Sequence, residues 1–251
     1  MNPEDLSSSL FVWIIIAGSA VFTGVIHGAT GMAGGLIMTI ILTELFGIKT
    51  AIPIMTCALI FSHASRVVIN WHHTDWRVSR TVLIFGLPMT ALGALIFNLI
   101  SPATVAAVFA GFLTLSIGIR RWAKQRQLYT GPKLLAAASA VWGLLAGNVV
   151  GPGFFLAPFL LGTGMNRLNF AGTLATATLV MNVVKLSVFG AVALLTPALL
   201  LAGVTVGLLT IPGNWIGSKI LRKMTDGVHS RIVEGMTVCI ILYFAVLAFY
   251  R

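Results

Sequence analysis

The stretch GVIHGATGMAGG, residues 24–35, places five glycines and one histidine inside an otherwise apolar part of the chain. Each glycine in a helix interior costs about 1 kcal/mol relative to alanine. So many glycines together predict either a break in a helix or a very close contact between helices. A second stretch of the same kind, GLLAGNVVGPG, occupies residues 143–153. The two stretches together decide how the chain folds.

The composition predicts an integral membrane protein. The chain has 251 residues, of which 58% are hydrophobic and 9% charged, and its mean hydropathy is +1.00. Soluble domains carry about 25% charged residues. Long apolar runs without alternation indicate an all-α membrane protein rather than a β-barrel. The Lys and Arg residues that give the net charge of +10 lie mostly between these apolar runs. We therefore expect a lipid bilayer as partner and no nucleic acid.

Ten apolar runs follow one another along the chain. Eight have the length of a full transmembrane helix, about 20 residues, and lie at 10–28, 50–71, 79–100, 103–121, 133–150, 168–190, 197–218 and 230–250. Two shorter runs, 33–48 and 152–165, each follow a glycine-rich stretch and are either short crossings or re-entrant segments. If all ten cross with the N-terminus outside, the main Lys and Arg clusters fall in the cytoplasm, as the positive-inside rule requires.

The two halves of the chain resemble each other. Gly24, Gly28 and Gly34 have counterparts 119 residues later, and the same offset relates His63 to Asn182 and Arg66 to Lys185. We therefore divide the chain into a first repeat (1–121), a cytoplasmic linker (122–132) and a second repeat (133–251). Five crossings in each half insert the halves in opposite directions, and this inverted 5+5 repeat is common in secondary transporters.

The glycine-rich stretches have two interpretations. They could serve close helix packing, as GxxxG motifs do. They could also be broken helices whose exposed amides and positive dipole ends bind an anion. Their recurrence before both short runs favours anion binding. The expected substrate-binding residues of the stretches are His27, Gly28, Thr30, Gly31, Gly34 and Gly35 in the first, and Gly147, Asn148, Gly151 and Gly153 in the second.

Polar residues within the long runs complete the expected site. An ionisable side chain deep in a bilayer costs about 3 kcal/mol or more, and the residues concerned are Ser62, His63, Arg66, Asn182 and Lys185. Arg66 and Lys185 are either anion ligands or anchors that reach the membrane surface. His27 is either a ligand, a proton carrier or a hydrogen-bonded core residue.

The other chemically active residues point away from catalysis and metal binding. Carboxylates are scarce, and Glu44 and Glu234 lie near the ends of their runs, which favours an anion over a cation as substrate. The stretch WHHTDWR (71–77) fits an interfacial aromatic belt better than a metal site. Cys57 and Cys239 lie in apolar runs and are expected to be packing residues. We expect no metal, no cofactor and no enzymatic activity.

At these residues the sequence resembles the sulfite exporter TauE/SafE family of membrane permeases, over nearly the whole chain. The first copy of the family's glycine motif is Gly24, Gly28, Gly31, Gly34 and Gly35. The second copy is Gly147, Gly151 and Gly153, followed by Pro158 and by AGTLAT at 171–176. The sequence departs from the pattern at Ala33, at Pro152 and at Thr39-Ile40, where the first copy would carry a proline.

The resemblance implies a secondary transporter of the bacterial inner membrane that moves small sulfur-containing anions such as sulfite, thiosulfate or organosulfonates. We expect alternating access, and we leave proton coupling and a homodimer open. Three other functions stay open from the residues alone: an anion channel, a non-transporting membrane scaffold and a membrane-embedded enzyme.

Overall fold

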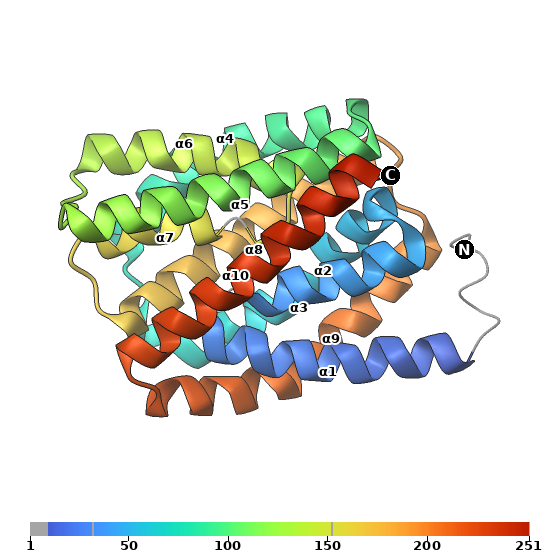
Figure 1. The fold of residues 1–251 in the computed structure, drawn as a ribbon, viewed down its shortest axis with the longest axis horizontal. Coiled ribbons are helices and arrows are strands. Elements are labelled where there is room, and N and C mark those ends of the chain that lie inside the picture. Colours follow the sequence, from blue (N-terminus) through green and yellow to red (C-terminus); the bar gives the residue numbers. More distant parts are fainter. Residues whose placement is uncertain (1–9, 32, 152, 251) are drawn as a thin grey trace.

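The protein is built from helices. The computed structural model describes residues 10–31, 33–151 and 153–250, and within these ranges the regular elements are ten α-helices and one 3₁₀ helix, without a strand (Figure 1). The elements are α1 (Leu10–Thr30), α2 (Ala33–Phe46), α3 (Ile48–Asn70), η2 (Trp71–His73), α4 (Trp76–Leu99), α5 (Pro102–Gln125), α6 (Pro132–Asn148), α7 (Gly153–Leu161), α8 (Arg167–Ala191), α9 (Pro197–Lys223) and α10 (Asp226–Tyr250).

Six helices of the described chain are long and apolar enough to cross a membrane. They cover Trp13–Thr30, Ile48–His73, Trp76–Leu99, Pro102–Gln125, Arg167–Ala191 and Pro197–Lys223. The sequence predicted eight such helices. The remaining two are α6, which has 17 residues because it ends at Asn148, and α10, which has 25 residues and contains a shorter apolar segment at Glu234–Leu247.

Both glycine-rich stretches interrupt a helix. Helix α1 ends at Thr30 and α2 begins at Ala33, while α6 ends at Asn148 and α7 begins at Gly153. The backbone φ angle is +86° at Gly31 and +77° at Gly151. Glycine adopts this left-handed conformation readily because it lacks a Cβ atom. The following helices are short, with 14 residues in α2 and nine in α7, or about 21 and 14 Å at 1.5 Å per residue.

Other glycines of the two stretches bring pairs of helices into close contact. A Cβ atom on Gly28 of α1 would lie 2.4 Å from the Asn214 carbonyl oxygen of α9. A Cβ atom on Gly147 of α6 would lie 2.4 Å from the Ala94 nitrogen of α4. Neither position can accept a side chain without moving a backbone. This packing is the GxxxG alternative that the sequence left open.

The helix pairs join the two halves of the chain. Helix α1 packs against α9 and α6 packs against α4, so each half contributes one helix to each pair. Helices α3 and α8 also contact each other, as do α5 and α10. In Figure 1, α6 and α4 lie along one edge of the bundle, and α1 and α9 along the opposite edge. The short helices lie between these edges.

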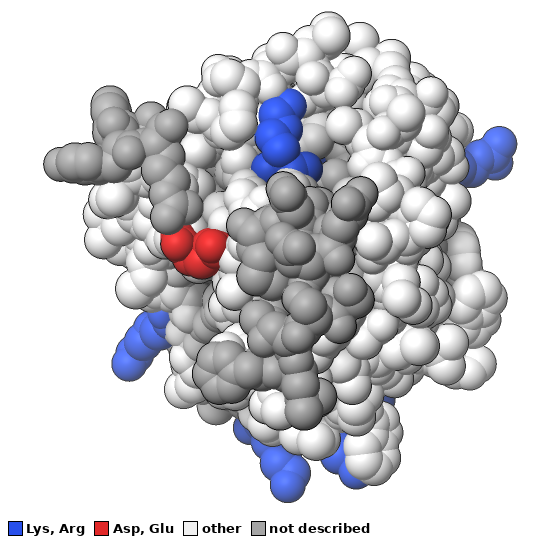
Figure 2. Space-filling view, turned by 90° about the vertical axis from the view of Figure 1, so that its right-hand side faces the viewer, with Lys and Arg blue, Asp and Glu red and all other residues white. Residues whose placement is uncertain are grey.

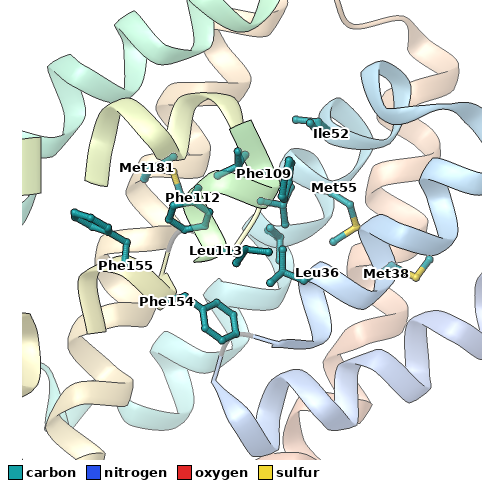
Figure 3. Packing of buried hydrophobic residues seen from close by; sticks show 14 of the residues in the cluster. Leu36, Met38, Ile52, Met55, Phe109, Phe112, Leu113, Phe154, Phe155 and Met181 are labelled. Carbon is teal, nitrogen blue, oxygen red and sulfur yellow. The ribbon is translucent and has the colours of Figure 1, made fainter. Parts of the chain in front are cut away.

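The core forms where the short helices meet α5. Leu36 of α2, Leu113 of α5 and Phe154 of α7 belong to one buried cluster, whose side chains converge in Figure 3. Phe109 of α5 stacks on Phe244 of α10, with ring centroids 4.3 Å apart. The apolar residues of α2 and α7 are thus packed inside protein rather than exposed on the outer surface of the bundle.

The charged residues concentrate at one end of the bundle. There Arg121 of α5 pairs with Glu234 of α10 at 2.6 Å, and the Arg167 guanidinium donates to the Met224 carbonyl at 2.6 Å. The opposite end, where α1 begins and α10 ends (Figure 1), shows few charged side chains where described residues are visible (Figure 2). The two ends therefore differ strongly in charge.

Candidate functional site

A small buried cavity lies where the two helix breaks meet. Its volume is about 20 Å³, which is room for about one water molecule. The walls come from both breaks, from α2 and α7, and from α3 and α8. The lining residues are His27, Gly31, Gly35, Leu59, His63, Val149, Val150, Gly151, Gly153, Leu174, Thr178, Met181 and Asn182.

Seven of the residues predicted from the sequence line this cavity, and they come from both halves of the chain. They are His27, Gly31, Gly35, His63, Gly151, Gly153 and Asn182. Gly34 and Ser62 instead line a smaller neighbouring cavity that shares His27 and Gly35 with the first. The predicted residues outside both cavities are Gly28, Thr30, Arg66, Gly147, Asn148 and Lys185.

His27 is held by the helix that follows the break. Its Nδ1 accepts a hydrogen bond from the Gly35 backbone N–H at 3.2 Å. A backbone N–H can only donate, so Nδ1 carries no proton and Nε2 carries it in the neutral ring. Binding a second proton at Nδ1 would break the bond to Gly35. It would also place a cation beside Arg66, whose Nη1 is 3.5 Å from the His27 Nε2.

The amides at the start of α2 are partly occupied. The Ala33 N–H donates to the Thr30 hydroxyl at 3.1 Å, and the Gly35 N–H donates to His27. A helix start leaves four N–H groups without helical partners. Two of these four are therefore bonded to side chains of the first stretch. The cradle of free amides predicted for Gly28–Gly35 is thus smaller than the sequence indicates.

Arg66 and Lys185 bind the carbonyl groups at the ends of the broken helices. Arg66 Nη1 donates to the Gly31 carbonyl at 2.7 Å. Lys185 Nζ donates to the Ala146 and Val149 carbonyls, each at 3.0 Å. Both side chains are 1% exposed, so neither reaches the surface as an anchor would. The last carbonyls of a helix need such donors, and the negative end of the helix dipole attracts cations.

The described carboxylates lie away from these two cations. Glu44 accepts a hydrogen bond from the Tyr243 hydroxyl at 2.6 Å. Asp75 accepts bonds from the Arg77 and Val78 amides at the start of α4, each at 3.0 Å. Glu234 pairs with Arg121. Within the described ranges, Arg66 and Lys185 therefore have carbonyl partners rather than carboxylate partners.

His63 and Asn182 face the cavity from α3 and α8. The His63 Nδ1 atom is buried and has no hydrogen-bond partner among the described residues. Asn182 uses one amide hydrogen to bond the Thr178 carbonyl at 2.8 Å and keeps the second. An unpaired buried nitrogen costs about 1–3 kcal/mol. His63 is thus the lining residue with the clearest capacity to bind a ligand.

Asn148 and Ser62 face other helices. Asn148 donates to the Leu144 carbonyl of its own helix at 3.0 Å and lies beside Gly93 of α4. Ser62 accepts a hydrogen bond from the Asn214 side chain at 2.9 Å. Asn214 is a buried polar residue that sequence reasoning missed. Its signal was an amide within an apolar run, next to Gly213.

The remaining wall residues were not predicted. Leu59, Val149, Val150, Leu174 and Met181 are apolar, and in a membrane protein apolar residues give no sign of lining a site. Thr178 donates its hydroxyl to the Leu174 carbonyl at 2.7 Å, as many threonines in apolar helices do. In the part of the chain that the structure describes, no group of three His, Cys, Asp or Glu residues could hold a metal ion.

The fold and the cavity define a class of protein: a polytopic helical membrane protein with a small cavity between two broken helices. Residues 16–244 match the family model described as Sulfite exporter TauE/SafE. The chain therefore belongs to the TauE/SafE family of membrane sulfite exporters, and the resemblance seen in the glycine motifs is confirmed. No curated protein and no solved structure matches the chain.

Proposed function

We propose that this chain is a secondary transporter that carries small sulfur oxyanions through the cavity between its two helix breaks. One observation carries the proposal: Gly31 of the first break and Gly151 of the second line the same buried space. Irregular backbone inside a membrane is tolerated only within protein or along a water-filled path. Broken helices that meet at a central site are typical of secondary transporters. Membership in a sulfite exporter family supports the sulfur anion.

The substrate would be sulfite, thiosulfate or an organosulfonate. Its oxygens would accept hydrogen bonds from His63 and from the free amide hydrogen of Asn182, which both line the cavity. The present volume of about 20 Å³ suits a water molecule, so the helices around the breaks must separate to admit the anion. This structure would then be a contracted state of the carrier.

We further propose an inverted repeat and alternating access. The packing of the helices supports the repeat. If α6 corresponds to α1 and α9 corresponds to α4, then the contact of α1 with α9 is equivalent to the contact of α6 with α4. Arg66 on the first break and Lys185 on the second are equivalent in the same way. Rocking one pair against the other would open the cavity to each side in turn. Residues 1–121 and 133–251 would be the two repeats.

The membrane orientation follows from the charge at the two ends. We propose eight full crossings, two short ones and an N-terminus outside a bacterial inner membrane, with the linker 122–132 in the cytoplasm. The pairing of Arg121 with Glu234, and of Arg167 with Met224, supports this orientation, because it brings basic residues of α5 and α8 to the same end of the bundle, beside the start of α10. The positive-inside rule assigns such an end to the cytoplasm.

If transport is coupled to protons, His27 and His63 are the two candidates for the carrier. His27 uses Nδ1 to accept the Gly35 amide, and it could take up a proton only by losing this bond. The His63 Nδ1 has no such partner. A homodimer stays a prediction, to be measured as the mass of the purified protein in detergent.

The test is radiolabelled sulfite flux into liposomes that contain the purified protein. A carrier should show flux that saturates with sulfite concentration and that unlabelled sulfite on the opposite side accelerates. Flux that rises linearly far beyond millimolar sulfite would favour a channel. Liposomes with protein but without any flux of sulfite, thiosulfate or sulfonate would overturn the proposed transport and favour a scaffold.

A further inference from the structure

Two buried basic side chains bind the backbone of the cavity wall, one at each helix break. Arg66 binds the carbonyl of Gly31, and Lys185 binds the carbonyl of Val149. Gly31 and Val149 both line the cavity. The charged groups are therefore one backbone unit away from the space itself, and both are 1% exposed. Water screens them little, so their charge acts on whatever enters the cavity.

The local charges around the cavity do not cancel. At each break the C-terminus of one helix carries about −0.5 charge, and the N-terminus of the next carries about +0.5. These two contributions offset each other at both breaks. What remains are Arg66 and Lys185, which no described carboxylate balances, because Glu44, Asp75 and Glu234 are bound elsewhere. With both side chains protonated, the site carries two positive charges.

Capping carbonyl groups does not by itself require a charged residue. Elsewhere in the chain neutral side-chain amides donate to carbonyls within their own helices. Asn70 donates to the Arg66 carbonyl at 2.9 Å, and Asn182 donates to the Thr178 carbonyl at 2.8 Å. A buried Lys or Arg is much more expensive in a membrane than an Asn. The two charges therefore need a second explanation besides helix capping.

We propose that Arg66 and Lys185 make the cavity selective for divalent oxyanions. The inference rests on the proposed function and gives it a charge class. His63 and Asn182 bind the anion directly, and the two cations behind the wall balance its charge. A dianion would leave the site neutral, a monoanion would leave one surplus charge, and an uncharged analogue would leave both. Arg66 and Lys185 are specificity-determining residues that act through charge, without contacting the anion.

Three sulfur compounds of nearly the same tetrahedral shape test whether the cavity selects divalent anions. Sulfate carries two negative charges, methanesulfonate carries one and dimethyl sulfone carries none. Their inhibition constants are measured against radiolabelled sulfite flux in proteoliposomes. We expect sulfate to compete at least about tenfold better than methanesulfonate, and dimethyl sulfone not to compete. Equal competition by sulfate and methanesulfonate in a protein that transports sulfite would overturn the inference and leave the proposed function standing.

Substitutions then locate the source of the selectivity. Lys185→Gln and Arg66→Gln can each still donate to carbonyls, but each removes one charge. We expect either change to lower the preference for sulfate over methanesulfonate by about tenfold or more. Lys185→Arg keeps the charge and should keep the preference. Lys49→Gln is the matched control, because Lys49 also donates to a helix carbonyl, that of Phe97, but Phe97, unlike Gly31 and Val149, does not line the cavity.

Thermal stabilisation of the purified protein by the same three compounds provides a readout independent of transport. If sulfite flux is absent but sulfate alone stabilises the protein, the proposed transport fails and the charge class survives. An unchanged preference in a folded Lys185→Gln protein would show that Lys185 is a helix cap only. If neither glutamine variant folds, the comparison of the three compounds on the unmodified protein still decides the matter.

Discussion

Arg66 and Lys185 show how one residue can connect fold and function. Each closes the end of a broken helix by donating to carbonyls 35 or more residues away. Each also brings a charge next to the cavity. In the same region, the side chains of His27 and Thr30 accept hydrogen bonds from backbone N–H groups at the start of α2. This leaves His63, whose Nδ1 has no partner within the described ranges, as the residue that we propose to bind substrate.

His63→Ala should weaken sulfite binding without unfolding the protein. One hydrogen bond to a charged group contributes about 1.5–3 kcal/mol, and 1.4 kcal/mol corresponds to a tenfold change in affinity. We therefore expect KM for sulfite in proteoliposomes to rise about tenfold to hundredfold. The control is His72→Ala in the exposed 3₁₀ helix, which should leave KM unchanged. A normal KM in His63→Ala would remove His63 from the site.

At the scale of helices, the sequence predicts what depends on local chemistry. Gly31 and Gly151 mark the breaks because only glycine takes their φ angles without strain. Helix rotation depends on distant contacts and could not be predicted. Asn148 was expected to bind the anion, but α6 packs so tightly on α4 at Gly147 and Gly93 that Asn148 faces α4. The carbonyl partners of Arg66 and Lys185 could not be predicted either, because these contacts also join residues that are distant in the sequence.

Gly28→Ala should loosen the contact between α1 and α9. The new methyl group would lie 2.4 Å from the Asn214 carbonyl oxygen, and overpacking of this kind costs about 1–3 kcal/mol. We expect the melting temperature in detergent to fall by roughly 3–10 °C. Gly18→Ala is the matched control, since it lies in the same helix with nothing within 4 Å of the added methyl group. Equal melting temperatures for the two variants would contradict the close contact.

At the scale of the whole molecule, the two halves depend on each other. Each of the closest helix pairs combines one helix from each half, so half of the chain alone would leave these glycine-lined faces uncovered. The cavity likewise needs both breaks. The two ends of the bundle differ in charge, because Arg121 and Arg167 lie at the end opposite the start of α1 (Figure 1). The orientation in the membrane therefore depends on the whole chain, and its test needs a probe at each end of the bundle.

Two single cysteines at opposite ends of the bundle test this orientation. Tyr129, which is 80% exposed in the linker, and Asn98, which is exposed near the end of α4, are replaced one at a time by cysteine. Cys57 and Cys239 are first replaced by alanine. A membrane-impermeant maleimide added to intact bacterial cells should label the cysteine at position 98 and leave position 129 unlabelled until the cells are opened. The positive-inside rule predicts this outcome, because Arg120 and Arg121 precede the linker and Lys124 lies within it. The reverse labelling pattern would place the basic end outside, and it would require the anion to approach Arg121 and its neighbours from the external side.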